Sequence, residues 1–228
     1  MTNSKTARHT SQYPEDILAN NRDLDTINYA EAHTLDEMFR ERVRRSPNKA
    51  AFKQFDHEKS LWIEQSWADV AYQVERWQVA FRESGLEKGD RVAICFKNSI
   101  EWVIFDQAAL RLGLVVVPIY VADRADNIAY ILGNSGSKLV LFSKAQTWDE
   151  VIASNENVDC VETVLAFNDE RTSKNNAVQI VEQWLPTEGQ HFERGLAEPD
   201  DLASIVYTSG TTGRPKGCLL YTSDAADD

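Results

Sequence analysis

Four stretches of the chain are almost continuously apolar, and they limit its possible folds more than any other feature. RVAICF, LVVVPIY, KLVLFS and LASIVYT occupy 91–96, 114–120, 138–143 and 202–208. Each is short and rich in β-branched residues, which is typical of strands that are buried on both faces. Segments with a helical apolar period separate them. The sequence therefore predicts an α/β fold, in which helices flank a mostly parallel sheet.

The segments between these strands carry start and stop signals of helices. Thr34 and Glu37 have the spacing of a capping box, and Ser66 and Asp69 repeat that spacing before a second helix. We expect the second helix to end at Gly85. Its predicted apolar face consists of Val70, Val74, Trp77, Val79 and Phe81. The other predicted elements are a strand in SPNKAAFKQF that pairs with 61–67, helices at 98–113, 125–133, 146–154 and about 178–185, and a strand at 161–167.

Charge and composition exclude some classes of partner. The 228 residues carry a formal net charge of −12, whereas a nucleic-acid backbone or an anionic membrane attracts a basic surface. We therefore expect no nucleic-acid partner. A peripheral membrane contact stays open, and the oligomeric state is not indicated.

The chain is expected to be cytoplasmic and to consist mainly of one folded unit. Its polar start lacks a secretory signal, and Cys95, Cys160 and Cys218 show no metal-binding or redox spacing. We expect residues 1–25 to form a flexible N-terminal arm. Residues 26–217 are interpreted as one unit, because no low-complexity linker divides them.

The last apolar strand runs into the segment YTSGTTGRPKG at 207–217, which has the chemistry of a phosphate-binding loop. Its glycines let backbone N–H groups approach phosphate oxygens closely, and successive N–H groups form a concave anion site. Four hydroxyl groups and the ammonium group of Lys216 add donors and positive charge. Composition alone would favour a solvated Ser/Thr/Gly loop, but the ordered combination after a strand favours phosphate binding.

Spacing excludes two better-known phosphate loops. A Walker A loop has Gly before its Lys and Ser or Thr after it, whereas Pro215 and Gly217 flank Lys216. The dinucleotide fingerprint needs GxGxxG between a strand and a helix, and GTTGRPKG lacks that spacing. The motif therefore argues against a P-loop ATPase and against a Rossmann dehydrogenase.

YTSGTTGRPKG resembles the phosphate-binding motif of the AMP-forming adenylating enzymes, which include acyl-CoA synthetases, luciferases and peptide-synthetase adenylation domains. The segments 66–119 and 127–142 are similar to the same family, so the resemblance covers roughly 34–217. PIY at 118–120 and IAYIL at 128–132 resemble the long-chain fatty acyl-CoA synthetase branch. The resemblance implies the first part of the large N-terminal domain of an adenylating enzyme.

The resemblance also implies a reaction, namely ATP-dependent activation of a carboxylic acid, here expected to be a long-chain fatty acid. The carboxylate would attack the α-phosphate of ATP, and coenzyme A would accept the acyl group from the acyl-adenylate. Donors held in place would stabilise the charge of the pyrophosphate leaving group. By motif match, the residues implied to hold the β- and γ-phosphates, with Mg²⁺ bridging the same oxygens, are Thr208, Ser209, Gly210, Thr211, Thr212, Gly213 and Lys216.

The motif supplies no nucleophile and no general base, so no catalytic residue and no metal-binding side chain is predicted within this chain. Three alternatives stay open. The parent protein could be an aryl-CoA ligase or a peptide-synthetase adenylation domain, or the chain could be a nucleotide-binding fragment that is not an enzyme.

Other candidate residues have simpler interpretations. Asp200 and Asp201 would point to opposite faces of an extended chain, so we expect turn residues rather than a metal or proton pair. Cys95 lies in an apolar strand and is expected to be a packed thiol. The four histidines lie in polar segments and are expected at the surface. Tyr120 follows a buried strand and is expected to pack.

After PKG the resemblance to the family stops. Leu219 and Leu220 could belong to the apolar strand that the family has next. Tyr221 and the residues after it do not fit that strand, because Thr222 stands at the place of the family's His. The family's acyl pocket, adenine-binding segment, ribose-binding acidic residue and C-terminal catalytic lysine have no counterpart. CLLYTS back-translates to a sequence that resembles a transposase end used in sequencing adapters. We therefore hypothesise that residues 218–228 are translated adapter, that the natural chain continues past Gly217, and that this chain is inactive alone.

Overall fold

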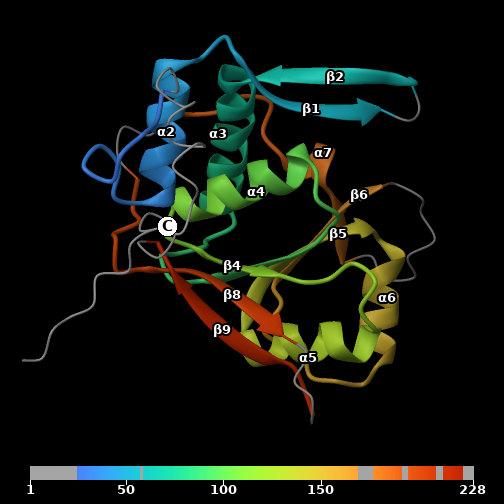
Figure 1. Cartoon of the computed structure of the whole chain (residues 1–228). Helices are drawn as coiled ribbons and strands as arrows, with labels where there is room; N and C mark the ends of the chain where they lie inside the picture. The colour runs from blue at the N-terminus through green and yellow to red at the C-terminus, as the bar shows by residue number, and fades with distance from the viewer. Residues whose placement is uncertain (1–24, 57–58, 169–176, 192–194, 209–212, 223–228) are drawn as a thin grey trace, which may run out of the picture.

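A mostly parallel sheet lies at the centre of the fold, with helices on both of its faces (Figure 1). The structure, a computed structural model, describes residues 25–56, 59–168, 177–191, 195–208 and 213–222. The strands of the sheet are β3 (Arg91–Cys95), β4 (Val115–Pro118), β5 (Ser137–Lys144), β6 (Thr163–Asn168), β7 (Val178–Ile180), β8 (Leu202–Thr208) and β9 (Lys216–Tyr221).

The order of these strands across the sheet is β7-β6-β5-β3-β4-β8-β9. Every neighbouring pair is parallel except β8 and β9, which are antiparallel. The α/β prediction is thus confirmed. The helices are α2 (Leu35–Arg45), α3 (Trp67–Glu83), α4 (Ile100–Arg111), α5 (Ala125–Ser135), α6 (Gln146–Ala153) and α7 (Val181–Trp184).

The buried core has two halves, one on each face of the sheet, because successive side chains of a strand point to opposite sides. Val92 and Ile94 of β3 pack with α3 and α4 on one face, whereas Ala93 and Cys95 pack with α5 and α6 on the other. Figure 1 shows α2, α3 and α4 together on the first side and α5 and α6 on the second. The helices on both sides explain why these strands are apolar at almost every position.

A separate antiparallel hairpin precedes the sheet, as the sequence predicts. It consists of β1 (Ala50–Asp56) and β2 (Leu61–Ser66). Ser66 also caps α3: its hydroxyl oxygen accepts a hydrogen bond from the backbone N–H of Asp69 at 3.1 Å, and the Asp69 carboxylate accepts one from the Ser66 N–H at 2.9 Å. This capping box fixes the point where the hairpin becomes a helix.

The predicted capping box of α2 is only half formed. Thr34 Oγ1 accepts a hydrogen bond from the backbone N–H of Glu37 at 3.2 Å. The Glu37 carboxylate instead accepts one from the N–H of His33, one residue before the cap, at 2.7 Å. The backbone N–H groups of His33 and Glu37 are therefore both hydrogen-bonded, but the Glu37 side chain does not accept from the N–H of Thr34 as a capping box requires.

Two predicted boundaries are wrong. Helix α5 continues through Gly133 to Ser135 and closes at Gly136, which has φ of 64°. The helix expected at about 178–185 begins as strand β7, which pairs with β6 at the sheet edge, and only its second half is helical. The first error took Gly133 rather than Gly136 as the residue that ends the helix, and Gly136 has the left-handed conformation of a C-cap. The second comes from pairing with β6, a tertiary contact that overrides the local pattern.

Two side chains lie elsewhere than expected. The buried face of α3 holds Val70, Val74, Trp77 and Phe81 as predicted, but Gln78 is fully buried where the prediction placed Val79. Tyr120 does not pack: 73% of its surface is exposed, because the chain leaves the sheet after Pro118.

The C-terminal part of the described chain continues the sheet. Strand β9 includes Leu219, Leu220 and Tyr221, so the expectation that Tyr221 falls outside a strand is wrong. Thr222 follows and is buried. Its hydroxyl oxygen lies 2.6 Å from the carbonyl oxygen of Glu198 and 2.6 Å from that of Pro199, and both carbonyl groups accept hydrogen bonds from it. The structure does not test the origin of residues 218–228, which stays a prediction. At the other end of the chain, residues 1–24 of the expected arm lie outside the described residues.

Candidate functional site

The motif YTSGTTGRPKG joins β8 to β9. Thr208 is the last residue of β8 and Lys216 is the first of β9, and the two are partners in the strand register. Thr208, Gly213 and Lys216 are all exposed. Three of the predicted phosphate-binding residues are therefore near the solvent on one hairpin. The other four, Ser209, Gly210, Thr211 and Thr212, lie outside the described residues.

The position of β8 explains why the motif lies at the edge of the sheet. Ser204 of β8 pairs with Val116 of β4, and its hydroxyl group donates to the Val116 carbonyl oxygen at 2.9 Å. Because β8 is parallel to β4, the motif begins at the carboxyl edge of the parallel strands. Ligands of open α/β sheets bind at this edge.

The last glycine of the motif has a packing role. A Cβ atom on Gly217 would lie 2.8 Å from Cγ2 of Ile205 and 3.3 Å from the ring of Tyr207, its partner across the hairpin. Glycine therefore lets β9 approach β8 closely. By contrast, a Cβ on Gly213 would meet no atom of the described residues within 4 Å.

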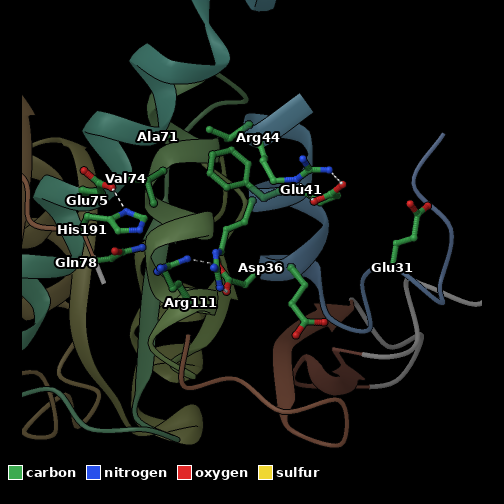
Figure 2. A pocket seen from close by; sticks show the side chains of 14 residues that line it. Glu31, Asp36, Glu41, Arg44, Ala71, Val74, Glu75, Gln78, Arg111 and His191 are labelled. Carbon is green, nitrogen blue, oxygen red and sulfur yellow. Dashed lines mark hydrogen bonds and ion pairs between the residues drawn. The ribbon is translucent and has the colours of Figure 1, made fainter. Parts of the chain in front are cut away.

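One cleft of the described structure lies far from the motif. It has a volume of about 530 Å³ and lies between α2, α3 and α4 (Figure 2). In Figure 1 these helices and the motif end of β8 are at opposite ends of the molecule. The lining residues include Asp36, Arg111, Glu75, Gln78 and His191.

Charged groups of this cleft are already paired with one another. Asp36 forms ion pairs with Arg111 at 3.3 Å and with Arg40 at 4.0 Å, yet burial raises the pKa of its carboxyl group above the ordinary value. Figure 2 shows the contact between Asp36 and Arg111. It also shows an ion pair between His191 and Glu75, whose nitrogen and oxygen atoms are 2.8 Å apart.

The three other acids of the cleft also have partners: Glu31 accepts from Asn28 and Arg45, Glu37 from His33, and Glu41 from Arg44 and Arg45. The lining contains five acids against three arginines. Such a surface repels the phosphates of a nucleotide. The cleft is therefore a packing seam of helices, and the motif hairpin is the better candidate for a nucleotide site.

The other candidate residues are placed largely as the sequence predicts. Burial, with a smaller contribution from Asp123, raises the pKa of the Cys95 thiol to about 12, so this packed cysteine is not a nucleophile. Asp201 is a turn residue: its carboxylate accepts from the Glu198 N–H at 2.6 Å and pairs with Lys88 at 2.7 Å. His33 and His191 are exposed, and the other two histidines lie outside the described residues.

Sequence reasoning missed one unusual carboxyl group, that of Asp106 on α4. Burial raises its pKa to about 7, although Gln107 Nε2 donates a hydrogen bond to it at 3.2 Å. The available signal was the single carboxyl residue Asp106 among the apolar residues in the middle of this helix. Across the described ranges, no three His, Cys, Asp or Glu side chains gather closely enough to hold a metal ion. Within the same ranges, no helix has the length and apolarity needed to cross a bilayer.

The exposed Thr208, Gly213 and Lys216 lie at the carboxyl edge of a mostly parallel sheet, where open α/β folds bind their ligands. The family described as "AMP-binding enzyme" matches residues 39–226, so the match continues past Gly217, where the sequence analysis expected the resemblance to stop. The chain belongs to this family, as the resemblance of its motif implied.

Known proteins of two kinds are similar to the chain. It is 31% identical over 167 residues to the long-chain-fatty-acid–CoA ligase FadD15 of Mycobacterium bovis. The matched region covers 72% of this chain and 27% of that protein. It is 34% identical over 154 residues to the nonribosomal peptide synthetase NPS2 of Ceriporiopsis subvermispora, covering 68% of this chain and 5% of that protein.

Among solved structures, the anthranilate CoA ligase AuaEII in complex with anthranoyl-AMP superposes with a TM-score of 0.73 at 19% identity, covering 84% of this chain and 35% of that one. This likeness shows a shared fold. The chain thus spans about a quarter of FadD15 and about a third of the ligase.

Proposed function

We propose that this chain is the ATP phosphate-binding part of an AMP-forming acid–thiol ligase. The observation that carries the proposal is the motif hairpin, which presents Thr208, Gly213 and Lys216 at the carboxyl edge of the sheet. In the whole protein, a carboxylic acid would react with ATP to give an acyl-adenylate and pyrophosphate. Coenzyme A would then take the acyl group and release AMP.

The chemistry of the motif fits the triphosphate of ATP. Hydroxyl groups and backbone N–H groups donate to the β- and γ-phosphate oxygens, and Lys216 adds a compact positive charge. We propose that Mg²⁺ binds through the same phosphate oxygens, because it prefers oxygen ligands and keeps much of its water. The motif residues would then hold the pyrophosphate group as its bond to the α-phosphate breaks.

A long-chain fatty acid is the proposed substrate, because FadD15 is described as a long-chain-fatty-acid–CoA ligase. A peptide-synthetase adenylation domain is the second candidate, favoured by the 34% identity to NPS2. An aryl-CoA ligase is the third, favoured by the fold shared with the anthranilate ligase. We further propose a cytoplasmic location and a peripheral membrane contact in the parent, where a lipid substrate would be collected.

Binding of MgATP to the purified chain tests the role of the hairpin. Lys216→Met should weaken binding about tenfold or more, because a hydrogen bond to a charged group contributes roughly 1.5–3 kcal/mol. Lys53→Met is the matched control: Lys53 is exposed on β1, where it pairs with Glu64 at 2.7 Å. Calorimetric titration measures both dissociation constants. Equal binding by the two variants would refute the proposed role of Lys216.

The activity of the parent protein needs its full coding sequence. A long read of the source DNA across codon 217 would show whether the frame continues past Gly217, as our adapter hypothesis requires. The expressed parent should release pyrophosphate when given ATP and a fatty acid, and it should form hydroxamates in the presence of hydroxylamine. A panel of fatty, aromatic and amino acids separates the three candidates. The 228-residue chain should be inactive in the same assay.

A further inference from the structure

Both legs of the motif hairpin contact one face of helix α5. From β8, the Tyr207 hydroxyl group donates a hydrogen bond to Oδ1 of Asn134 at 2.7 Å. From the segment before β9, the guanidinium carbon of Arg214 lies 4.8 Å from the centre of the Tyr130 ring. Tyr130 and Asn134 are four residues apart on α5, so their side chains are neighbours on the helix surface. Along the chain, these two contacts bracket the motif residues 208–213.

Arg214 has a second partner. Its Nη2 lies 2.9 Å from Oε1 of Glu156, which follows α6. A guanidinium group within about 6 Å of an aromatic ring centre gains a cation–π attraction, and its planar fork also suits a carboxylate. The side chain is therefore held from two directions, although most of it is exposed.

Helix α5 and the segment that carries Glu156 are joined around a shallow hollow beside Arg214. The hollow has a volume of about 390 Å³, and both Tyr130 and Glu156 line it. The backbone carbonyl of Asn157 lies so close to α5 that a Cβ atom on Gly133 would be only 2.4 Å from its oxygen. The Cys160 thiol also lies 3.4 Å from the Leu132 carbonyl oxygen. Through these two contacts, Tyr130 and Glu156 belong to one continuous support.

We propose that Arg214 is a positioning residue that holds the β9 leg of the hairpin on this support and so sets the position of Lys216 for the nucleotide phosphates. The proposal rests on the proposed function for the identity of the ligand, but the docking of the leg stands on the contacts alone. The support consists of Tyr130, Asn134 and Glu156, none of which belongs to the phosphate-binding motif. Pro215 restricts the backbone between Arg214 and Lys216, which transmits the constraint.

A direct contact between Arg214 and phosphate is the competing explanation, and Glu156→Gln separates the two. This variant keeps the arginine and removes a negative charge beside it. If Arg214 acts only by its charge, MgATP should bind equally well or more tightly. If Arg214 acts by docking the leg on Glu156, MgATP should bind more weakly.

Limited proteolysis without nucleotide tests the docking itself. Trypsin does not cut the Arg214–Pro215 bond, so cleavage after Lys216 reports opening of this leg, and cleavage after exposed Lys53 on β1 is the internal reference. Loss of the ion pair and the cation–π contact in Arg214→Ala should raise the normalised rate at Lys216 about three- to thirtyfold. Glu156→Gln should raise it about two- to fivefold. Unchanged rates in both variants would overturn the proposal.

A charge exchange distinguishes docking from a general loss of structure. Arg214→Glu places a second carboxylate beside Glu156, so trypsin should cleave this variant fastest after Lys216. Adding Glu156→Arg restores an ion pair of opposite direction and should slow that cleavage again, whereas a merely damaged fold would not recover. A double variant that cleaves as fast as Arg214→Glu would refute the docking role.

A titration with MgATP then completes the test. Weaker binding by Glu156→Gln, with the overall fold intact, supports positioning, whereas equal or tighter binding overturns it. If the unsubstituted chain itself fails to bind MgATP, the proposed function fails, while the proteolysis result still decides whether Arg214 docks the hairpin. The two claims can therefore fail separately.

Discussion

Single buried polar side chains of this protein have consequences that can be measured. Gln78 of α3 is fully buried, and among the described residues neither its Nε2 nor its Oε1 atom finds a hydrogen-bond partner. Figure 2 shows it on the wall of the cleft, next to Arg111 and His191. Leaving a buried polar group unsatisfied costs roughly 1–3 kcal/mol.

Gln78→Met should therefore stabilise the chain by about 1–2 kcal/mol, because methionine has a similar volume and no polar group to satisfy. Gln73→Met on the same helix is the control. Gln73 accepts a hydrogen bond from Arg76 at 2.8 Å, so that variant should gain nothing. Urea denaturation measures both free energies of unfolding, and a destabilised Gln78→Met chain would contradict the expectation.

Asp106 predicts a pH dependence of stability. Its pKa rises from 3.8 to about 7 in the folded chain because of burial. The folded state therefore binds the proton more tightly than the unfolded state, so stability should fall as the pH rises from about 4 to about 7. The loss is on the order of 2–4 kcal/mol.

Asp106→Asn should remove most of this decline and should be more stable than the unsubstituted chain above pH 7. Asp126→Asn at an exposed position of α5 controls for the loss of one charge. Thermal unfolding between pH 4 and pH 8 measures the slope of stability against pH. An equal slope in all three proteins would show that Asp106 does not titrate in this range.

The sequence predicts most of the elements, and its failures have a common cause. Continuous apolar runs identify β3, β4, β5 and β8, and cap spacing places the starts of α2 and α3. Residues 178–180 form a strand only because the edge of β6 is available to them. Gln78 is buried because its neighbours on α3 are buried, which residue type alone does not reveal. Local patterns thus identify elements, whereas edge pairing and burial depend on partners that are distant in the sequence.

Helix α5 offers a prediction in which packing opposes helix propensity. Gly133→Ala should improve intrinsic helix stability by about 1 kcal/mol. However, the added Cβ would lie 2.4 Å from the backbone oxygen of Asn157, which cannot move as freely as a side chain. The net effect should be a destabilisation of about 1–3 kcal/mol.

The control is Gly213→Ala, where a Cβ would meet no atom of the described part of the chain within 4 Å, and its stability should hardly change. Calorimetric unfolding compares the two variants with the unsubstituted chain. A more stable Gly133→Ala protein would mean that the segment at Asn157 moves easily away from α5, which would also weaken the argument that α5 and the Glu156 segment form one support.

At the scale of the whole molecule, the candidate site is only partly accessible to prediction from sequence. The order of residues in YTSGTTGRPKG identifies a phosphate loop, and the alternation of apolar strands implies that it lies at the edge of a sheet. The contact of Tyr207 with Asn134 of α5 joins positions 73 residues apart. The contact of Arg214 with Glu156, which follows α6, joins positions 58 residues apart. No spacing in the sequence encodes such contacts, so they emerge only from the folded chain.

The apolar side chains of β9 lead to a prediction about association of whole molecules. Strand β9 is the last in the order of the described sheet, and Leu219, Leu220 and Tyr221 are 53%, 44% and 41% exposed. An exposed apolar strand at a sheet edge favours pairing with another chain. The net charge of −12 opposes that association, and salt screens the repulsion.

Purified chains should therefore associate, and more strongly as the salt concentration rises. Replacing Leu219 and Leu220 by Lys should reduce association, because charged residues on an edge strand disfavour pairing between sheets. Leu61→Lys with Trp62→Lys on β2 adds the same two charges at another exposed apolar position and should have a smaller effect. Sedimentation velocity at low and high salt measures the distribution of species. A monomer under all conditions would show that β9 is not an associating edge, and equal effects of the two double variants would assign the association to net charge rather than to this strand.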